Sequence, residues 1–243
     1  MKLRSIALGV AAVAFAACAS SDSVSPNGGP FPTSWVPNVT NKFFPLVAGT
    51  IYKYRADTPD GTELDSVEVL RVLHEVNGVP ATQVHDQVFV AGHLTEETFD
   101  WFAQDAYGNV WYLGEDSKEY DNGQVVSTEG SWEWGVDGAQ PGIIMWADPL
   151  SQMNNAYRQE FYAGHAEDWG KVIGSNKTVT VPAGTFDGCI ETEEWDGVDP
   201  SAPHENKYYC PLVGNVLEDA PDEHLQLITL TQSPGLRRAS SRP

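Results

Sequence analysis

The sequence predicts an all-β protein: a single antiparallel β domain, built as a curled sheet, a half-barrel or a sandwich, after a lipoprotein signal peptide and a flexible tether. Three observations predict this fold. Short stretches rich in β-branched and aromatic residues recur along the chain, turn residues separate them about every ten positions, and no long segment has the apolar stripe of a helix. This rhythm is typical of an antiparallel meander.

The first residues have the layout of a secretory signal peptide. Two basic residues begin the chain, and the apolar run that follows, residues 6–17, is too short to span a bilayer. Small residues then precede Cys18, and this arrangement resembles the bacterial lipobox, in which the Cys is acylated and becomes the first mature residue. Phe15 stands where the lipobox has Leu, Val or Ile. We predict that residues 1–17 are a signal peptide and that Cys18 is the lipidation site, with palmitate among its acyl chains.

Residues 18–34 are rich in Ser, Gly and Pro and have no apolar periodicity, which predicts a flexible linker after the acylated Cys18. Several acyl chains at one Cys anchor a protein far more strongly than one chain does. Ala19, rather than Asp, follows the Cys, and this favours the outer membrane if the organism has one. The predicted location is the cell envelope, with the membrane as the first partner. The alternative is an ordinary secreted protein with a Cys near its cleavage site.

The chain is strongly acidic, with 14 basic and 34 acidic residues and a formal net charge of -20. An acidic surface repels phosphate backbones, so we exclude nucleic acid as a partner. The same charge attracts divalent cations, although solubility is an equally simple role for it. The one cluster of basic residues lies in the tail, residues 233–243, which we predict to be disordered.

The folded domain is expected to cover residues 35–232. The predicted strands, in chain order, are residues 50–54, 64–76, 81–91, 99–104, 110–113, 118–120, 124–126, 131–135, 142–145, 177–181, 188–195, 207–210 and 225–230. Turns are expected at residues 105–109 and 121–123, where Asp, Asn and Gly combine. Residues 147–157 and 164–172 are each expected to form a turn or two of helix.

The sequence has three cysteines, for which we predict two different roles. If Cys18 is acylated, Cys189 and Cys210 remain as an even pair in an oxidising compartment. Their spacing fits two strands that flank a long loop, and a disulfide there would stabilise the domain by about 3 kcal/mol. The alternative is two free buried thiols.

Residues 85–115 contain the densest group of acids and amides, and Asp100, Asp105, Asn109 and Glu115 are the candidate metal ligands. Calcium takes six to eight oxygen ligands, so calcium is the cofactor that these side chains would hold. The segment does not match an EF-hand loop. The alternative is that residues 105–109 form a type I turn and that the acids are surface charges.

Aromatic residues are unusually frequent in one part of the chain. The candidate ligand-binding side chains are five tryptophans: Trp101, Trp111, Trp132, Trp134 and Trp146. Aromatic side chains flanked by acids and amides suit sugars or apolar ligands in a concave sheet. The alternative is a large aromatic core, with nearby glycines that allow close packing.

Two motifs suggest a family. GNVWYLGE at residues 108–115 and GSWEWGVDGAQPGI at residues 130–143 resemble a family of uncharacterised bacterial secreted proteins and lipoproteins. The resemblance extends over residues 44–217. It implies an antiparallel sheet curled around a core, and it brings no known activity.

These observations leave three hypotheses for the function. The first is a lipid-anchored, non-catalytic envelope module that binds a sugar, an apolar molecule or a cation. The second is a structural or assembly lipoprotein that contacts other envelope proteins through a sheet edge. The third is a hydrolase that uses carboxylates or His residues from segments 85–105 and 160–168. No nucleophile motif or phosphate-binding glycine loop is present in the sequence.

Overall fold

A computed structural model describes residues 24–36, 38–221 and 223–232. The predicted signal peptide, Cys18 and the predicted tail at residues 233–243 lie outside the described residues. Within the described part of the chain, no helix is both long and apolar enough to cross a membrane.

The described residues form strands almost throughout. In chain order these are β1 (Trp35–Val36), β2 (Val39–Thr40), β3 (Pro45–Leu46), β4 (Ile51–Thr58), β5 (Gly61–Val76), β6 (Val79–Val90), β7 (His93–Asp105), β8 (Val110–Asp121), β9 (Gln124–Ser127), β10 (Trp132–Glu133), β11 (Gln140–Met145), the 3-10 helix η1 (Pro149–Gln152), β12 (Ala156–Arg158), β13 (Glu160–Phe161), β14 (Trp169–Val181), β15 (Gly184–Trp195), β16 (Glu205–Cys210), β17 (Gly214–Ala220) and β18 (Glu223–Thr231). The predicted single all-β domain is confirmed.

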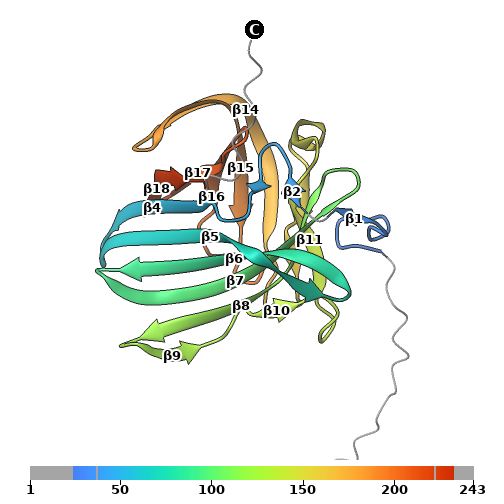
Figure 1. The fold of residues 1–243 in the computed structure, drawn as a ribbon, viewed down its shortest axis with the longest axis horizontal. Helices are drawn as coiled ribbons and strands as arrows, with labels where there is room; N and C mark the ends of the chain where they lie inside the picture. Colours follow the sequence, from blue (N-terminus) through green and yellow to red (C-terminus); the bar gives the residue numbers. More distant parts are fainter. Residues whose placement is uncertain (1–23, 37, 222, 233–243) are drawn as a thin grey trace, which may run out of the picture.

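One antiparallel sheet contains most of the strands and is nearly closed as a barrel. Its hydrogen-bonded order is β12-β14-β15-β16-β17-β18-β4-β5-β6-β7-β8-β11-β13, and β1, β9 and β10 pair beside this path. In Figure 1, β4 to β8 run roughly horizontally while β14 and β15 run roughly vertically, so the sheet curls strongly between them. The two ends of the sheet, β12 and β13, are separated in sequence by Gln159 alone, so the ends meet there.

Gly142 allows this closure. A Cβ atom at Gly142 on β11 would lie 2.4 Å from the carbonyl carbon of Gln159 and 2.5 Å from the carbonyl oxygen of Arg158. Only a residue without a side chain lets β11 approach the link between β12 and β13 so closely. The glycines near the tryptophans could serve either close packing or room for a ligand, and at Gly142 the structure shows close packing against the backbone of Arg158 and Gln159.

The predicted hairpin turns are present, but the helices differ from expectation. Residues 106–109 connect β7 to β8, and Asn122 and Gly123, with φ of 50° and 75°, connect β8 to β9. Segment 147–157 contains one turn of helix, the 3-10 helix η1, and then the start of β12. Segment 164–172 forms no helix, because residues from Trp169 onward pair with β15 in the sheet. Sequence analysis also missed β17, which pairs with β16 and β18.

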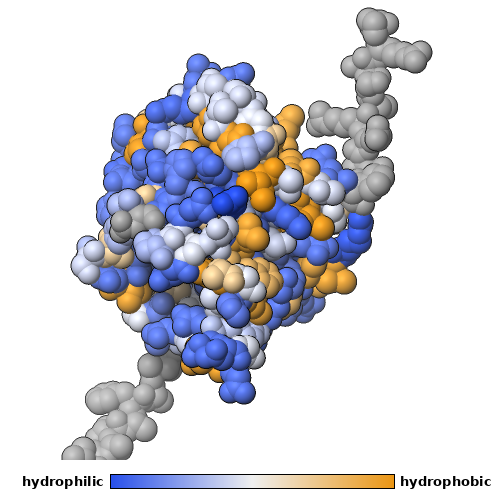
Figure 2. All heavy atoms as spheres, turned by 90° about the vertical axis from the view of Figure 1, so that its left-hand side faces the viewer, coloured by the Kyte–Doolittle hydropathy of each residue, from blue (hydrophilic) through white to orange (hydrophobic). Residues whose placement is uncertain are grey.

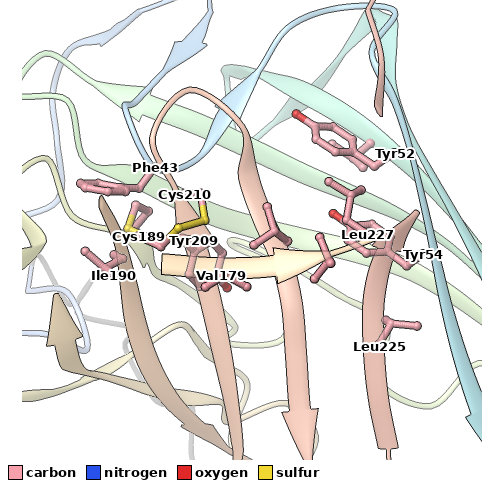
Figure 3. Close-up of a cluster of buried hydrophobic side chains, with 14 of the residues drawn as sticks. Phe43, Tyr52, Tyr54, Val179, Cys189, Ile190, Tyr209, Cys210, Leu225 and Leu227 are labelled. Atoms are coloured by element: carbon pink, nitrogen blue, oxygen red, sulfur yellow. A yellow bond between two sulfur atoms is a disulfide. The ribbon is translucent and has the colours of Figure 1, made fainter. Parts of the chain in front are cut away.

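The interior of the curled sheet contains the main hydrophobic core, to which both halves of the sheet contribute (Figure 3). Tyr52 and Tyr54 come from β4, Val179 from β14 and Ile190 from β15. The buried residues Cys189 and Cys210 form a disulfide that joins β15 to β16 within this core. The bond lies where the spacing of the two cysteines predicts, on two strands that flank a loop.

A second apolar cluster lies on the opposite face of β7, β8 and β11. Side chains alternate along β7, so Phe102 belongs to the interior core while Trp101 and Ala103 belong to this outer cluster. Phe31 and Trp35, from the segment that precedes the sheet, cover it, and both rings contact Trp111. On the side that faces the viewer in Figure 2, hydrophobic patches lie among hydrophilic residues.

Candidate functional site

A cavity of about 530 Å³ lies inside the curled sheet. Its apolar wall comes from β4 to β7 and from the segment around β3, and includes Phe44, Tyr52, Val67, Val84 and Phe102. Its other walls are acidic. Nine of the lining residues are acids, namely Asp65, Asp86, Asp100, Glu160, Asp168, Glu194, Asp196, Glu205 and Glu218.

Three aspartates form a diagonal row across neighbouring strands. Asp65 on β5, Asp86 on β6 and Asp100 on β7 all line the cavity. The register places Val67 opposite Asp86, and Val84 opposite Asp100. Each aspartate is therefore two residues along its strand from an apolar residue on the same face, and the acidic row runs directly beside the apolar wall.

The first two aspartates of this row have unpaired oxygens. Asp65 is 8 % exposed, and no donor group of another residue pairs with its buried Oδ1 atom or with Oδ1 of Asp86. Burial raises the pKa of Asp65, and the charge of Asp86 and a hydrogen bond between the two carboxyls raise it further. A buried carboxyl of this kind retains its proton at pH values where an exposed one is ionised.

Tyr112 links two further carboxyls. Its hydroxyl lies 2.5 Å from Oδ1 of Asp100 and 3.0 Å from Oε2 of Glu115. A phenol has one proton and donates it to one acceptor at a time. The two carboxyls and the hydroxyl can therefore all be hydrogen-bonded only if one of the carboxyls is itself protonated. Burial, reinforced by Asp86, raises the pKa of Asp100 to about 7, and burial with Asp100 raises the pKa of Glu115 well above its usual value.

Lys207 is the single cation among the described residues that line the cavity, and acids surround it. Its Nζ atom lies 3.1 Å from Glu205, 3.4 Å from Glu218 and 3.6 Å from Glu194. Burial alone would lower the pKa of Lys207, but the three glutamates together raise it well above its usual value. The positive charge of Lys207 is therefore shared among these neighbours.

Glu160 and Asp168, two of the predicted hydrolase candidates, also line the cavity. Trp132 donates a 2.6 Å hydrogen bond from Nε1 to Oε2 of Glu160. Burial and the charge of Asp168 raise the pKa of Glu160 to about 8, and burial raises that of Asp168 to about 6. Gln159, beside them, is 4 % exposed, and its Nε2 atom has no hydrogen-bond partner.

The four predicted metal ligands do not come together. Asp100 and Glu115 meet inside the sheet through Tyr112, whereas Asp105 and Asn109 lie in the turn between β7 and β8. Within the described residues, no group of three or more His, Cys, Asp or Glu side chains is arranged to hold a metal ion.

Asp105 instead stabilises the turn. Its Oδ1 atom accepts hydrogen bonds from the backbone N–H groups of Tyr107 and Asn109, at 2.8 and 3.0 Å. Its Oδ2 atom accepts from the Asn109 side chain at 2.8 Å and from Nε1 of Trp111 at 3.0 Å. These four donors occupy both oxygens of a carboxylate that is 2 % exposed.

None of the five predicted ligand-binding tryptophans lines the cavity. Trp101 and Trp111 are buried in the outer cluster, and Trp134 and Trp146 pack against that cluster. Trp132 is buried in a small separate cluster, where its ring meets that of Tyr112 edge-on. The structure therefore places these side chains in packed aromatic clusters.

The histidines considered for catalysis lie apart from one another. His85 on β6 contacts Glu97 on β7 at 2.9 Å, while His93 begins β7 after the turn at residues 91 and 92. His165 stacks on Tyr162. None of the three lines the cavity.

Comparisons with known proteins find two similar solved structures. A protein of Bacteroides fragilis, described as exported and as having a YmcC-like fold, is 14 % identical with a TM-score of 0.48, and the match covers 79 % of this chain and 100 % of that one. A Parabacteroides distasonis protein described as a lipoprotein is 12 % identical with a TM-score of 0.41, over 79 % and 99 % of the two chains. No family model and no curated protein matches the chain.

Sequence analysis missed several residues of the cavity. Asp65, Glu194, Lys207 and Glu218 line it but were not candidates. A signal for them exists: each is a charged residue on the same face of a strand as buried apolar residues, as Asp65 is with Val69. Charges on exposed faces are so frequent in this chain that the signal is weak without the register of the sheet.

Proposed function

We propose that this protein is a lipid-anchored cell-envelope protein that binds a small molecule inside its curled sheet. The observation that supports the proposal is the cavity of about 530 Å³, which combines an apolar wall with buried, unpaired polar atoms of Asp65 and Gln159. Small-molecule sites are typically concave, have volumes of about 300–1,000 Å³ and contain a few polar groups among apolar ones. Each buried polar group without a partner costs about 1–3 kcal/mol, and a ligand that pairs with it offsets that cost.

The envelope location is proposed from the N-terminal sequence. A short signal peptide followed by Cys18 supports acylation and membrane anchoring, with the outer membrane favoured by Ala19. Binding is proposed rather than catalysis because many polar groups of the cavity pair with one another. Lys207 pairs with three carboxylates, and Tyr112 contacts two.

The cavity is tested with N-phenyl-1-naphthylamine, a neutral dye that fluoresces in apolar surroundings. The full chain with Cys18→Ser, which removes the acylation site, is used so that no detergent competes for the dye. We expect saturable binding of one dye per chain. Val67→Trp fills the cavity from β5 and should weaken dye binding about tenfold or more. Val72→Trp, on the same strand but 60 % exposed, is the matched control and should bind normally.

Two results would contradict the proposal. One is the absence of saturable dye binding by the folded protein. The other is equal binding by the Val67→Trp and Val72→Trp variants when both unfold at the same temperature as the parent protein.

A further inference from the structure

We infer that the cavity selects an organic cation, a ligand with a protonated amine at the Asp65–Asp86 pair and an apolar body against Val67, Val84 and Phe102. The inference rests on the proposed function, because it names the ligand class of the same cavity. Three observations support it: the charge of the lining, the position of the aspartates beside the apolar wall, and the unpaired oxygens.

Acidic residues greatly outnumber basic ones in the described lining of the cavity. Nine acids line the cavity, and Lys207 is the single cation among the described lining residues. Lys207 contacts Glu194, Glu205 and Glu218, on the β15–β17 side. The Asp65–Asp86 pair lies on β5 and β6, and Lys207 forms its ion pairs with the three glutamates and not with these two aspartates, so a cation paired with them would have to come from a ligand.

The register of the sheet sets the distance between the two parts of such a ligand. Asp65 and Val67 are two residues apart on β5, as are Asp86 and Val84 on β6, and Asp100 and Phe102 on β7. A strand rises about 3.3 Å per residue, so each aspartate lies roughly 7 Å along its strand from its apolar partner, and Val67 and Val84 lie about 5 Å across from Asp86 and Asp100. These separations fit an amine joined to an apolar group through a few bonds.

The Asp65–Asp86 pair has no N–H or O–H donor from a neighbouring residue at its buried Oδ1 atoms, and an ammonium group would supply such donors. Oδ1 of Asp65 and Oδ1 of Asp86 are both buried without hydrogen-bond partners, and Asp65 is 92 % buried as a residue, being 8 % exposed. An ammonium group has three N–H donors and no acceptor. Burial, the charge of Asp86 and a hydrogen bond between the two carboxyls raise the pKa of Asp65, so the pair shares a proton; a bound ammonium would replace that proton, which leaves to solvent. Tyr54, directly opposite Asp65 in the register, adds an aromatic ring beside the pair.

An organic cation fits this lining better than a metal ion does. Within the described residues, no three or more acids or His side chains gather in the arrangement that a metal requires. A hard cation such as calcium would also gain nothing from the apolar wall. Calcium is therefore an alternative that the experiment includes.

The experiment compares ligands of the same size and different charge by calorimetry on the full chain with Cys18→Ser at pH 7. The probes are 2-phenylethylammonium, 2-phenylethanol, 3-phenylpropionate and calcium chloride. We expect the ammonium to bind about tenfold or more tightly than the alcohol, with the carboxylate weakest. The double variant Asp65→Asn/Asp86→Asn removes both carboxylates and should reduce the ammonium to within about twofold of the alcohol.

The control is Asp57→Asn/Asp60→Asn, which makes the same change of charge at two exposed positions near the end of β4 and should keep the preference for the ammonium. If the alcohol binds as tightly as the ammonium, the inference is overturned while the proposed function stands. If calcium binds and the ammonium does not, the inference is overturned in favour of a metal site. If neither the probes nor the dye bind the folded protein, both the inference and the proposed function are overturned.

Discussion

At the scale of single residues, Asp100 and Asp105 show how one residue type has two roles on one strand. They are five positions apart on β7, so they point to opposite faces. Asp105 accepts four hydrogen bonds in the turn and needs both oxygens as acceptors. Asp100 lies in the cavity beside Asp86 and the hydroxyl of Tyr112, where burial raises its pKa to about 7.

This difference predicts opposite effects for the same substitution. Asp105→Asn replaces an acceptor oxygen with a donor and should lower the free energy of unfolding by about 2 kcal/mol. Asp100→Asn imitates the protonated carboxyl and should raise the free energy of unfolding at pH 8 by about 1–3 kcal/mol, because the variant has no charge to bury. Urea unfolding of both variants at pH 8 measures the two effects. Destabilisation of similar size in both would show that Asp100 is needed as a carboxylate.

At the scale of elements, the segment before the sheet differs most from its prediction. Residues 18–34 are predicted to be a flexible linker, yet residues 24–34 pack on the body. Asn27 exchanges two hydrogen bonds with the backbone of Arg158 on β12, at 2.8 and 2.6 Å, and the ring of Phe31 contacts Trp111 and Trp134. Five residues separate Cys18 from Val24, the first described residue, and the six steps between them span at most about 20 Å. An anchor at Cys18 would therefore hold the sheet close to the membrane.

Asn27→Ala tests whether this segment is held by its side chain. We expect amide hydrogen exchange in residues 24–36 to rise about tenfold, because both hydrogen bonds to Arg158 are lost, while exchange in the rest of the sheet is unchanged. Exchange measured by mass spectrometry on the full chain reports both regions. Asn155→Ala, at an exposed position after η1, is the control and should leave residues 24–36 as protected as before. Unchanged exchange in the Asn27 variant would mean that Phe31 and Trp35 hold the segment alone.

At the scale of the whole molecule, the acidic interior sets the response to pH. Burial raises the pKa of Asp168 to about 6, of Asp100 and Glu218 to about 7, and of Glu160 to about 8. In the unfolded chain these groups titrate near pH 4. Between pH 4 and pH 8 the folded state therefore binds more protons than the unfolded state, and its stability falls as pH rises.

We expect the unfolding temperature to be higher at pH 5 than at pH 8 by roughly 5 °C or more. Thermal unfolding followed by circular dichroism over this range measures the change. Surface repulsion at a net charge of -20 acts in the same direction, but salt screens it. The effect of the buried carboxyls should therefore persist in 0.5 M sodium chloride, and a curve that becomes flat in salt would assign the change to the surface.

The local sequence determines much of this protein. Alternating β-branched and aromatic residues predict the strands, and the Asp-Asn-Gly sequence predicts the turn between β8 and β9, because side-chain alternation and turn conformation depend on neighbouring residues alone. The same local information misplaced segment 164–172 as helix, because its strand conformation from Trp169 onward depends on pairing with the distant strand β15.

Only the tertiary structure decides which acids matter. Asp65 and Glu218 are more than 150 positions apart in the sequence and line one cavity, because the sheet curls until strands far apart along the chain face each other. The five candidate tryptophans pack instead on the outer face of β7, β8 and β11 or against Tyr112. Alternation assigns each side chain to one of two faces, but the curvature of the sheet decides which face encloses a cavity.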